Sequence, residues 1–153
     1  MRVIGIDPGI SGALVVLEDG VPVEWLRTPI WWQGKHNRVD PYALGDWLKA
    51  VTWNTALDGA VIEQVGAMPN QGVTSMFSFG HATGTIYGAL GALSIPVRRV
   101  TPQAWKKAAG IAVGANKDAA RSKATEIWPK WYALRKKGEG QAFADAALIA
   151  KFG

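Results

Sequence analysis

The stretch Arg2-Val-Ile-Gly-Ile-Asp-Pro-Gly9 is an apolar run that ends on one acidic residue, Asp7, and then turns with Pro-Gly. Short apolar runs that are followed by turn residues are typical of buried β-strands. The next two runs, 12–18 and 21–27, are separated by Asp19-Gly20, a pair that favours a two-residue hairpin turn. We therefore expect the chain to open with three antiparallel strands.

Downstream of residues 29–39, which we expect to be a loop, the pattern alternates between helices and strands. Asp40-Pro41 is typical of a helix start, because Asp caps free amide groups and Pro fits the first turn. Three antiparallel strands followed by two parallel ones make a mixed five-stranded sheet flanked by helices, an α/β fold in one domain over 1–153. The predicted later elements are strands over 58–63 and 95–100 and helices over 41–51, 73–93, 102–109, 116–129 and from 141 to the end.

The composition excludes several classes of protein. With 48% hydrophobic residues in a chain of 153, a full core is expected, and the absence of cysteine excludes disulfides, zinc-thiolate sites and thiol nucleophiles. The N-terminus lacks the long apolar stretch of a signal peptide, and we expect a cytoplasmic protein. Residues 64–97 carry no charge, but their many Gly, Ser, Thr and Asn residues argue against a membrane span.

The basic residues are concentrated in one segment. From Arg98 to Lys137 there are eleven Lys and Arg against two acids, a net charge of +9, whereas the rest of the chain sums to −4. Such a block is either a solvated surface without a partner or a phosphate-binding face.

Three acidic residues stand where a metal site is expected. Asp7 and Glu63 each end an apolar strand, and Asp145 is the single acid of the apolar run 143–150. If strands one and four are parallel neighbours, the first two emerge at one sheet edge, and charges there are costly unless they are paired or metal-bound. The alternatives are a turn-forming acid for Asp7, an ion-pair partner for Glu63 and a helix-dipole acid for Asp145.

Five segments of the chain resemble a known family. They are Ile4-Gly-Ile-Asp-Pro-Gly9, Val61-Ile-Glu-Gln-Val65, residues 96–107, residues 117–123 and Ala144-Asp-Ala-Ala-Leu-Ile-Ala150. In this order they resemble the RuvC-type Holliday junction resolvases, which have a ribonuclease-H-like fold. Residues 96–107 and 117–123 particularly resemble the bacteriophage members. The resemblance covers nearly the whole chain.

The resemblance implies a crossover junction endodeoxyribonuclease. Such an enzyme is a homodimer that binds four-way or other branched DNA and nicks two strands symmetrically, in the host cytoplasm if the chain is of bacteriophage origin. It implies two Mg²⁺ or Mn²⁺ ions per active site, held by Asp7, Glu63 and Asp145, with Asp7 bridging both ions and one ion activating the attacking water.

The resemblance also implies DNA contacts. The loop after Glu63 would approach the junction centre, where family members place an apolar or aromatic side chain that unstacks a base; Met68, Phe77 and Phe79 are the candidates. Phosphates would be held by Lys106, Lys107, Lys117 and Arg121.

One position departs from the family pattern. The family usually has a fourth acid or histidine three to five residues before the last Asp, and here those positions are Ala142, Gln141 and Gly140. Either Glu139, one residue further upstream, reaches the site, or Ala142 marks a lost ligand and a chain that binds DNA but cleaves it poorly. Both interpretations stay open from the sequence.

Two further patterns suggest contacts without deciding them. Gly80, Gly84 and Gly88 share one face of the predicted helix and allow either the sheet or a second subunit to approach closely. Trp31-Trp32 either packs under the loop, stacks on bases or contacts a second subunit. Trp25, Trp47 and Trp105 are expected in or near the core.

Competing functions are a broader structure-specific DNA nuclease with the same motifs and a non-catalytic DNA-structure-binding protein on the same fold. An actin-like ATPase also begins with an Asp-Gly loop after a strand, but the chain is too short for its two lobes, and the sequence has no second phosphate loop.

Overall fold

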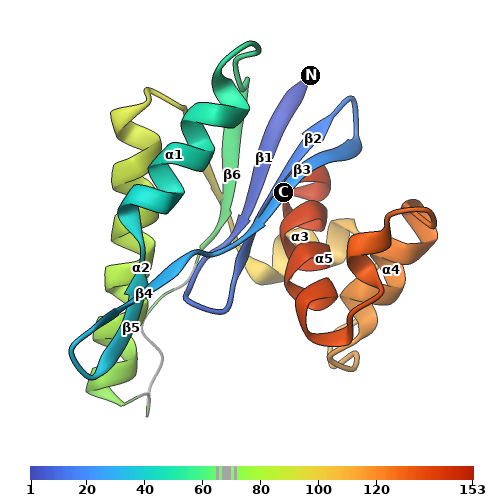
Figure 1. The fold of residues 1–153 in the computed structure, drawn as a ribbon. Coiled ribbons are helices and arrows are strands. Elements are labelled where there is room, and N and C mark those ends of the chain that lie inside the picture. The colour runs from blue at the N-terminus through green and yellow to red at the C-terminus, as the bar shows by residue number, and fades with distance from the viewer. Residues whose placement is uncertain (65, 67–69, 71) are drawn as a thin grey trace.

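A mixed five-stranded sheet, in the order β3-β2-β1-β6-β7, forms the centre of the computed structural model, which describes residues 1–64, 66, 70 and 72–153 (Figure 1). The first three strands are antiparallel, and β6 and β7 run parallel to β1. The predicted sheet is therefore confirmed. Its strands are β1 (Arg2–Asp7), β2 (Ala13–Glu18), β3 (Val21–Arg27), β6 (Gly59–Glu63) and β7 (Val97–Val100).

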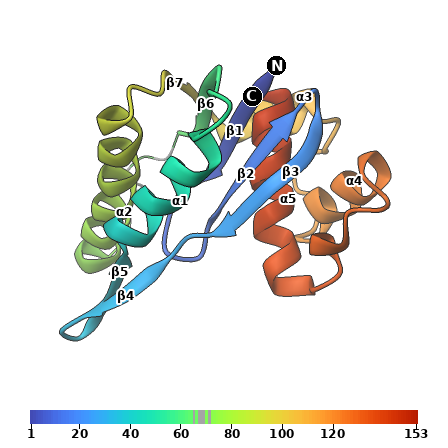
Figure 2. The ribbon, with the colours of Figure 1, turned by 45° about the horizontal axis from the view of Figure 1, so that its top comes forward.

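Helices cover both faces of this sheet, as Figures 1 and 2 show. On one face lie α1 (Pro41–Thr52) and α2 (Val73–Ala92). On the other lie α3 (Pro102–Ala108), α4 (Ala119–Ile127), the 3₁₀ turn η1 (Tyr132–Leu134) and α5 (Lys137–Phe152).

The alternation of side chains on β2 explains why this sheet is covered twice. Leu14 and Val16 pack in the core cluster on the α1–α2 side, whereas Ala13, Val15 and Leu17 pack in the cluster on the α3–α5 side. Because successive residues of a strand point to opposite faces, a strand that is apolar at every position needs a layer on each side.

The turn and helix-capping residues that were predicted from the sequence have those roles in the structure. Asp19 and Gly20 both have positive φ, 49° and 81°, as a tight hairpin turn requires. The Asp40 carboxylate accepts hydrogen bonds from the Tyr42 and Ala43 amides at 2.9 and 3.0 Å, which caps α1. Thr101 caps α3 in the same way through the Ala104 amide.

The predicted loop over residues 29–39 is wrong. The chain forms a second, two-stranded antiparallel sheet there, β4 (Ile30–Gln33) and β5 (His36–Val39), which projects beyond the main sheet in Figure 2. All four residues of β4 are exposed, so this strand has no buried face and shows no apolar alternation, whereas β5 is half-buried and ends on the core residue Val39. Trp32 is 75% exposed, which contradicts packing of that indole under a loop.

Two helix starts differ from those expected. The helix predicted over 116–129 begins at Ala119, because Asn116 first closes a turn by accepting from the Asp118 amide. The last helix begins at Lys137 and not near Gln141. Gly140 permits this, because a Cβ at that position would collide with the backbone of Leu134. No described helix combines the length and the apolarity that a bilayer crossing requires.

Candidate active site

Asp7 and Glu63 lie at the same edge of the sheet. Their strands pair in parallel with Ile6 opposite Ile62, so each acid is the next residue along its strand. The turn after β1 is tight: a Cβ on Gly12 would overlap the carbonyl of Asp7, so only glycine lets the chain fold back there. The predicted juxtaposition of these two strand ends is confirmed by the sheet topology.

Helix α5 carries Asp145 to this edge. The helix lies directly on β1, because a Cβ on Gly5 would overlap the backbone of Ala146 and come within 2.6 Å of the Ala150 amide nitrogen. This close approach places the helix face around Asp145 over the strand that ends in Asp7. The residues that flank Asp145, Ala144 and Ala146, are fully buried.

The electrostatics show that the acids are crowded. Burial, together with the charges of Asp145 and Glu63, raises the pKa of Asp7 to about 8. Burial also raises the pKa of Asp145 to about 6, although a hydrogen bond from Gln141 opposes this change. Lys106 lowers the pKa of both groups, which places its ammonium charge near the acids. Arg27 also lowers the pKa of Asp7, but the two cations do not offset its burial and the neighbouring carboxylates.

Glu63 has a partner that the sequence did not reveal. The indole Nε1–H of Trp105 donates a hydrogen bond to Glu63 Oε1 over 2.7 Å. Trp105 is 1% exposed, as expected for a core residue, and Lys106 Nζ lies 5.3 Å from the centre of its ring. The sequence did contain one signal for this contact: a tryptophan stands directly before Lys106 and Lys107, in the short helix that follows a strand.

Gln141 is the second residue that the sequence did not single out for the site. Its Nε2 donates to both carboxylate oxygens of Asp145, over 3.2 and 3.3 Å. Its Oε1 is buried and has no hydrogen-bond partner among the described residues. Positions four apart on a helix share one face, so both side chains point toward the same space.

The two positions considered for a fourth ligand lie elsewhere. Glu139 pairs with Lys136 over 3.2 Å on the surface. Ala142 is 6% exposed and packs in the apolar cluster on the α3–α5 side, together with Leu134 and Phe143. Among the described residues, no hydrogen bond or ion pair joins the side chain of either residue to the three acids.

The donor set fits a hard divalent cation. Asp7, Glu63, Asp145 and the unpartnered Gln141 oxygen offer only oxygen ligands, which Mg²⁺ prefers. Among the described residues, however, no three acidic or histidine side chains are already drawn together at metal-binding spacing.

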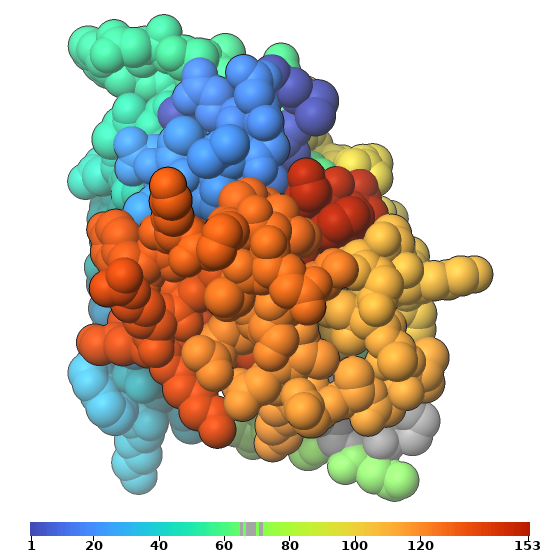
Figure 3. Space-filling model, turned by 90° about the vertical axis from the view of Figure 1, so that its right-hand side faces the viewer, coloured from blue at the N-terminus to red at the C-terminus, as the bar shows by residue number. Residues whose placement is uncertain are grey.

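A cavity of about 950 Å³ opens beside Asp145 and Gln141. Its wall contains the predicted phosphate ligands Lys106, Lys107 and Lys117 and the loop between α3 and α4. In Figure 3 this part of the chain, coloured yellow to orange, lies at the right and the bottom of the face shown, beside the deeper orange residues that follow it. Arg121 is instead held within the chain, by an ion pair to Asp118 over 3.6 Å and a hydrogen bond to the Leu134 carbonyl.

The predicted base-unstacking residues have different surroundings. Met68 lies outside the described residues. Phe77, in the first turns of α2, is 65% exposed and lies 5.7 Å from the Arg38 guanidinium. Phe79 is half-buried, and its ring packs near Gly9 after β1.

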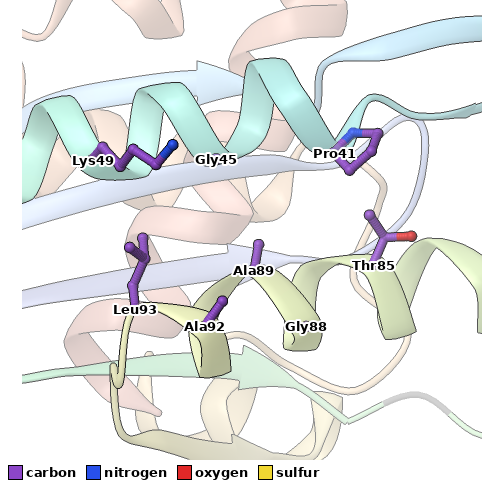
Figure 4. A pocket seen from close by; sticks show the side chains of 8 residues that line it. All are labelled: Pro41, Gly45, Lys49, Thr85, Gly88, Ala89, Ala92 and Leu93. Atoms are coloured by element: carbon purple, nitrogen blue, oxygen red, sulfur yellow. The ribbon is translucent and has the colours of Figure 1, made fainter.

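The glycine face of α2 does not pack against the sheet. Its buried residues are Ala82, Ile86 and Leu90, whereas a Cβ on Gly80, Gly84 or Gly88 would meet no described atom within 4 Å. Packing of these glycines within the described part of the chain is thereby contradicted. A groove between α1 and α2 adjoins this face, and Gly45, Gly88, Ala89 and Ala92 line it (Figure 4).

The sheet order, the layered helices and the acidic strand ends define a ribonuclease-H-like fold. Among solved structures, the chain is similar to Thermus thermophilus RuvC in complex with a Holliday junction substrate, with a TM-score of 0.68, 21% identity, and coverage of 98% of this chain and 90% of that one. A second Thermus thermophilus RuvC structure gives a TM-score of 0.61 at 19% identity, covering 99% and 94%. No family model and no curated protein sequence matches the chain.

Proposed function

We propose that this protein is a metal-dependent endodeoxyribonuclease that resolves four-way or other branched DNA. The observation that supports the proposal is that Asp7 and Glu63 end neighbouring strands at one sheet edge, with the helix that carries Asp145 packed over it beside Lys106 and a lysine-lined cavity, on a fold similar to that of RuvC. Two Mg²⁺ or Mn²⁺ ions, when bound, would activate water and stabilise the leaving oxygen. The whole chain, residues 1–153, acts as one domain.

The residues of the chain prepare this site in two ways. Asp7, whose pKa is about 8, loses its proton when a cation binds, because the positive charge offsets the burial and repulsion that raise it. Lys106 lowers the pKa of Asp7 and of Asp145, so its side chain lies near the acids, where a DNA phosphate must approach. Lys107 and Lys117, on the wall of the adjoining cavity, hold the flanking phosphates.

As the fourth ligand we propose Gln141 in place of Glu139 or an acid lost at Ala142. The buried, unpartnered Oε1 of Gln141 supports this, since such an atom is costly unless it gains a partner. A neutral amide in this place leaves the site with three carboxylates.

The proposed assembly is a homodimer joined through the exposed glycine face of α2. That helix has no charged residue over its 20 positions, and its glycines leave room for close approach of another backbone. Two copies would present two sites, as symmetric nicking of a junction requires. The similarity of residues 96–107 and 117–123 to bacteriophage members supports a bacteriophage-type enzyme that acts in the host cytoplasm.

The deciding experiment incubates the protein with labelled four-way junctions and with linear duplex, in Mg²⁺ or Mn²⁺, beside Asp7→Asn. Symmetric nicks in the junction alone that vanish in the variant are expected. Equal cutting of both substrates would indicate a broader structure-specific nuclease. Junction binding without cutting by the wild-type protein would indicate a cleavage-deficient binding protein.

A further inference from the structure

The indole of Trp105 contacts the candidate metal ligand Glu63, and the arrangement of β6, β7 and α3 explains this contact. Glu63 ends β6 and is paired with Val100, the last residue of β7. The Gln64 amide donates to the Val100 carbonyl over 2.6 Å, which keeps the two strand ends together. The chain then continues from Val100 directly into α3, so this helix starts beside Glu63.

The start of α3 determines where the indole points. The Thr101 hydroxyl accepts from the Ala104 amide over 3.2 Å, and the Trp105 amide donates to the Thr101 carbonyl over 3.3 Å. These bonds orient the first turn of the helix. Trp105 then lies under the helix, 1% exposed, with its N–H against the carboxylate.

The hydrogen bond has the features of a strong one. It joins a neutral donor to a carboxylate over 2.7 Å, and the donor, Trp105, is buried while Glu63 is half-buried at the end of its strand. Among the described residues, Oε1 is the one Glu63 oxygen with a hydrogen-bond partner, so Oε2 stays available to another ligand. A buried indole also moves little, because the surrounding packing restricts its rotamers.

We propose that Trp105 is a positioning residue for metal binding: its indole N–H holds Glu63 Oε1 so that Oε2 faces the cation. This inference rests on the proposed metal-dependent function and deepens it. Outer hydrogen-bond partners of metal ligands typically change metal affinity by about 10- to 100-fold. Trp105 touches neither DNA nor metal in this role and acts only through Glu63.

Trp131 provides a matched control. It is buried in the same apolar cluster, and its Nε1 has no hydrogen-bond partner among the described residues. Trp105→Phe and Trp131→Phe therefore remove the same atoms from the same core. Only Trp105→Phe removes a hydrogen-bond donor from a carboxylate, that of Glu63.

The experiment measures Mn²⁺ binding to the DNA-free protein by isothermal titration calorimetry. Trp105→Phe is expected to weaken binding by about 10-fold or more, whereas Trp131→Phe is expected to stay within about twofold of wild type. In a Glu63→Gln background, Trp105→Phe should have no further effect. Equal losses in both tryptophan variants, or none in Trp105→Phe, would overturn the inference.

A second measurement uses the wild-type protein, so its result does not depend on whether a variant folds. In a ¹H–¹⁵N spectrum of the wild-type protein, the Trp105 indole resonance should shift on titration with Mg²⁺, and that of Trp131 should stay in place. A Trp105 resonance that does not move while Mg²⁺ binds would contradict the inference. Absence of any binding of Mn²⁺ or Mg²⁺ to the wild-type protein would instead refute the proposed metal site itself, so the two failures are distinct.

Discussion

Gln141 lies one helical turn before Asp145 on α5 and donates from its Nε2 to both oxygens of that carboxylate, over 3.2 and 3.3 Å. The amide oxygen at the other end of the same group is buried and unpartnered among the described residues. The side chain therefore does two things at once: it orients an acid and presents a free oxygen beside it.

Replacement of Gln141 tests its role as fourth ligand. Gln141→Leu is expected to weaken Mn²⁺ binding by about 10-fold, because both the ligand oxygen and the bond to Asp145 are lost. Gln141→Glu is expected to tighten it by adding a negative charge. Calorimetric titration measures both, with Glu139→Gln as a control that should match wild type, because Glu139 pairs with Lys136 on the surface. Weaker binding in Glu139→Gln alone would reverse the assignment.

Ala142→Asp is expected to destabilise the protein and not to restore activity. Ala142 is 6% exposed in an apolar cluster, where burying an uncompensated carboxylate costs on the order of several kcal/mol. Thermal unfolding should show a lower Tm for Ala142→Asp, with Ala142→Val as a control for added volume. A folded Ala142→Asp protein that cuts junctions faster than wild type would support the lost-ligand interpretation instead.

The stability of the metal-free protein should fall as pH rises. The pKa of Asp7 is raised to about 8 and that of Asp145 to about 6, so the folded protein holds protons that the unfolded chain releases near pH 4. Tm should decline between about pH 4 and pH 8 and then level off. In Asp7→Asn the decline should end near pH 6, where Asp145 has titrated. Saturating Mg²⁺ should remove most of the decline in the Tm of the wild-type protein. A pH profile of Tm in Asp7→Asn that equals the wild-type profile would contradict the assignment of the raised pKa to Asp7.

Replacement of Lys117 should affect DNA binding, whereas replacement of Arg121 should affect the stability of the protein. Lys117→Ala is expected to reduce the slope of log Kd against log salt concentration by about one, as loss of one phosphate contact predicts. Arg121→Ala should instead lower Tm, since its guanidinium binds Asp118 and the Leu134 carbonyl. Fluorescence anisotropy over a salt series, beside thermal unfolding, separates the two effects. Equal salt slopes in Lys117→Ala and wild type would exclude this phosphate contact.

A bulky residue on the glycine face of α2 should prevent dimerisation. Gly84 is exposed, and a Cβ at this position would meet no described atom within 4 Å, so Gly84→Leu fits the single chain but blocks close approach of a second. Light scattering after gel filtration should show a monomer. Gly138→Leu, another helical glycine with open space around it, should leave the oligomeric state unchanged. A dimeric Gly84→Leu protein would place the interface elsewhere.

The sequence alone determined the order of the five strands of the main sheet and of the helices around it, and the positions of Asp7, Glu63 and Asp145 on them. Each of these features depends on a short stretch of chain: an apolar run that ends on an acid, a capping residue or a tight turn. Parallel pairing of β1 with β6 then brings Asp7 and Glu63 to one edge, because residues that follow paired positions lie side by side.

The tertiary structure decided what surrounds those acids. The bond from Trp105 to Glu63 spans 42 positions of the chain, and the orphaned oxygen of Gln141 depends on what packs around it. The open glycine face of α2 and the exposed strand β4 likewise depend on what does not pack against them. Local patterns contain no information on such distant partners, because burial and hydrogen bonding between remote segments arise only when the helices settle on the sheet.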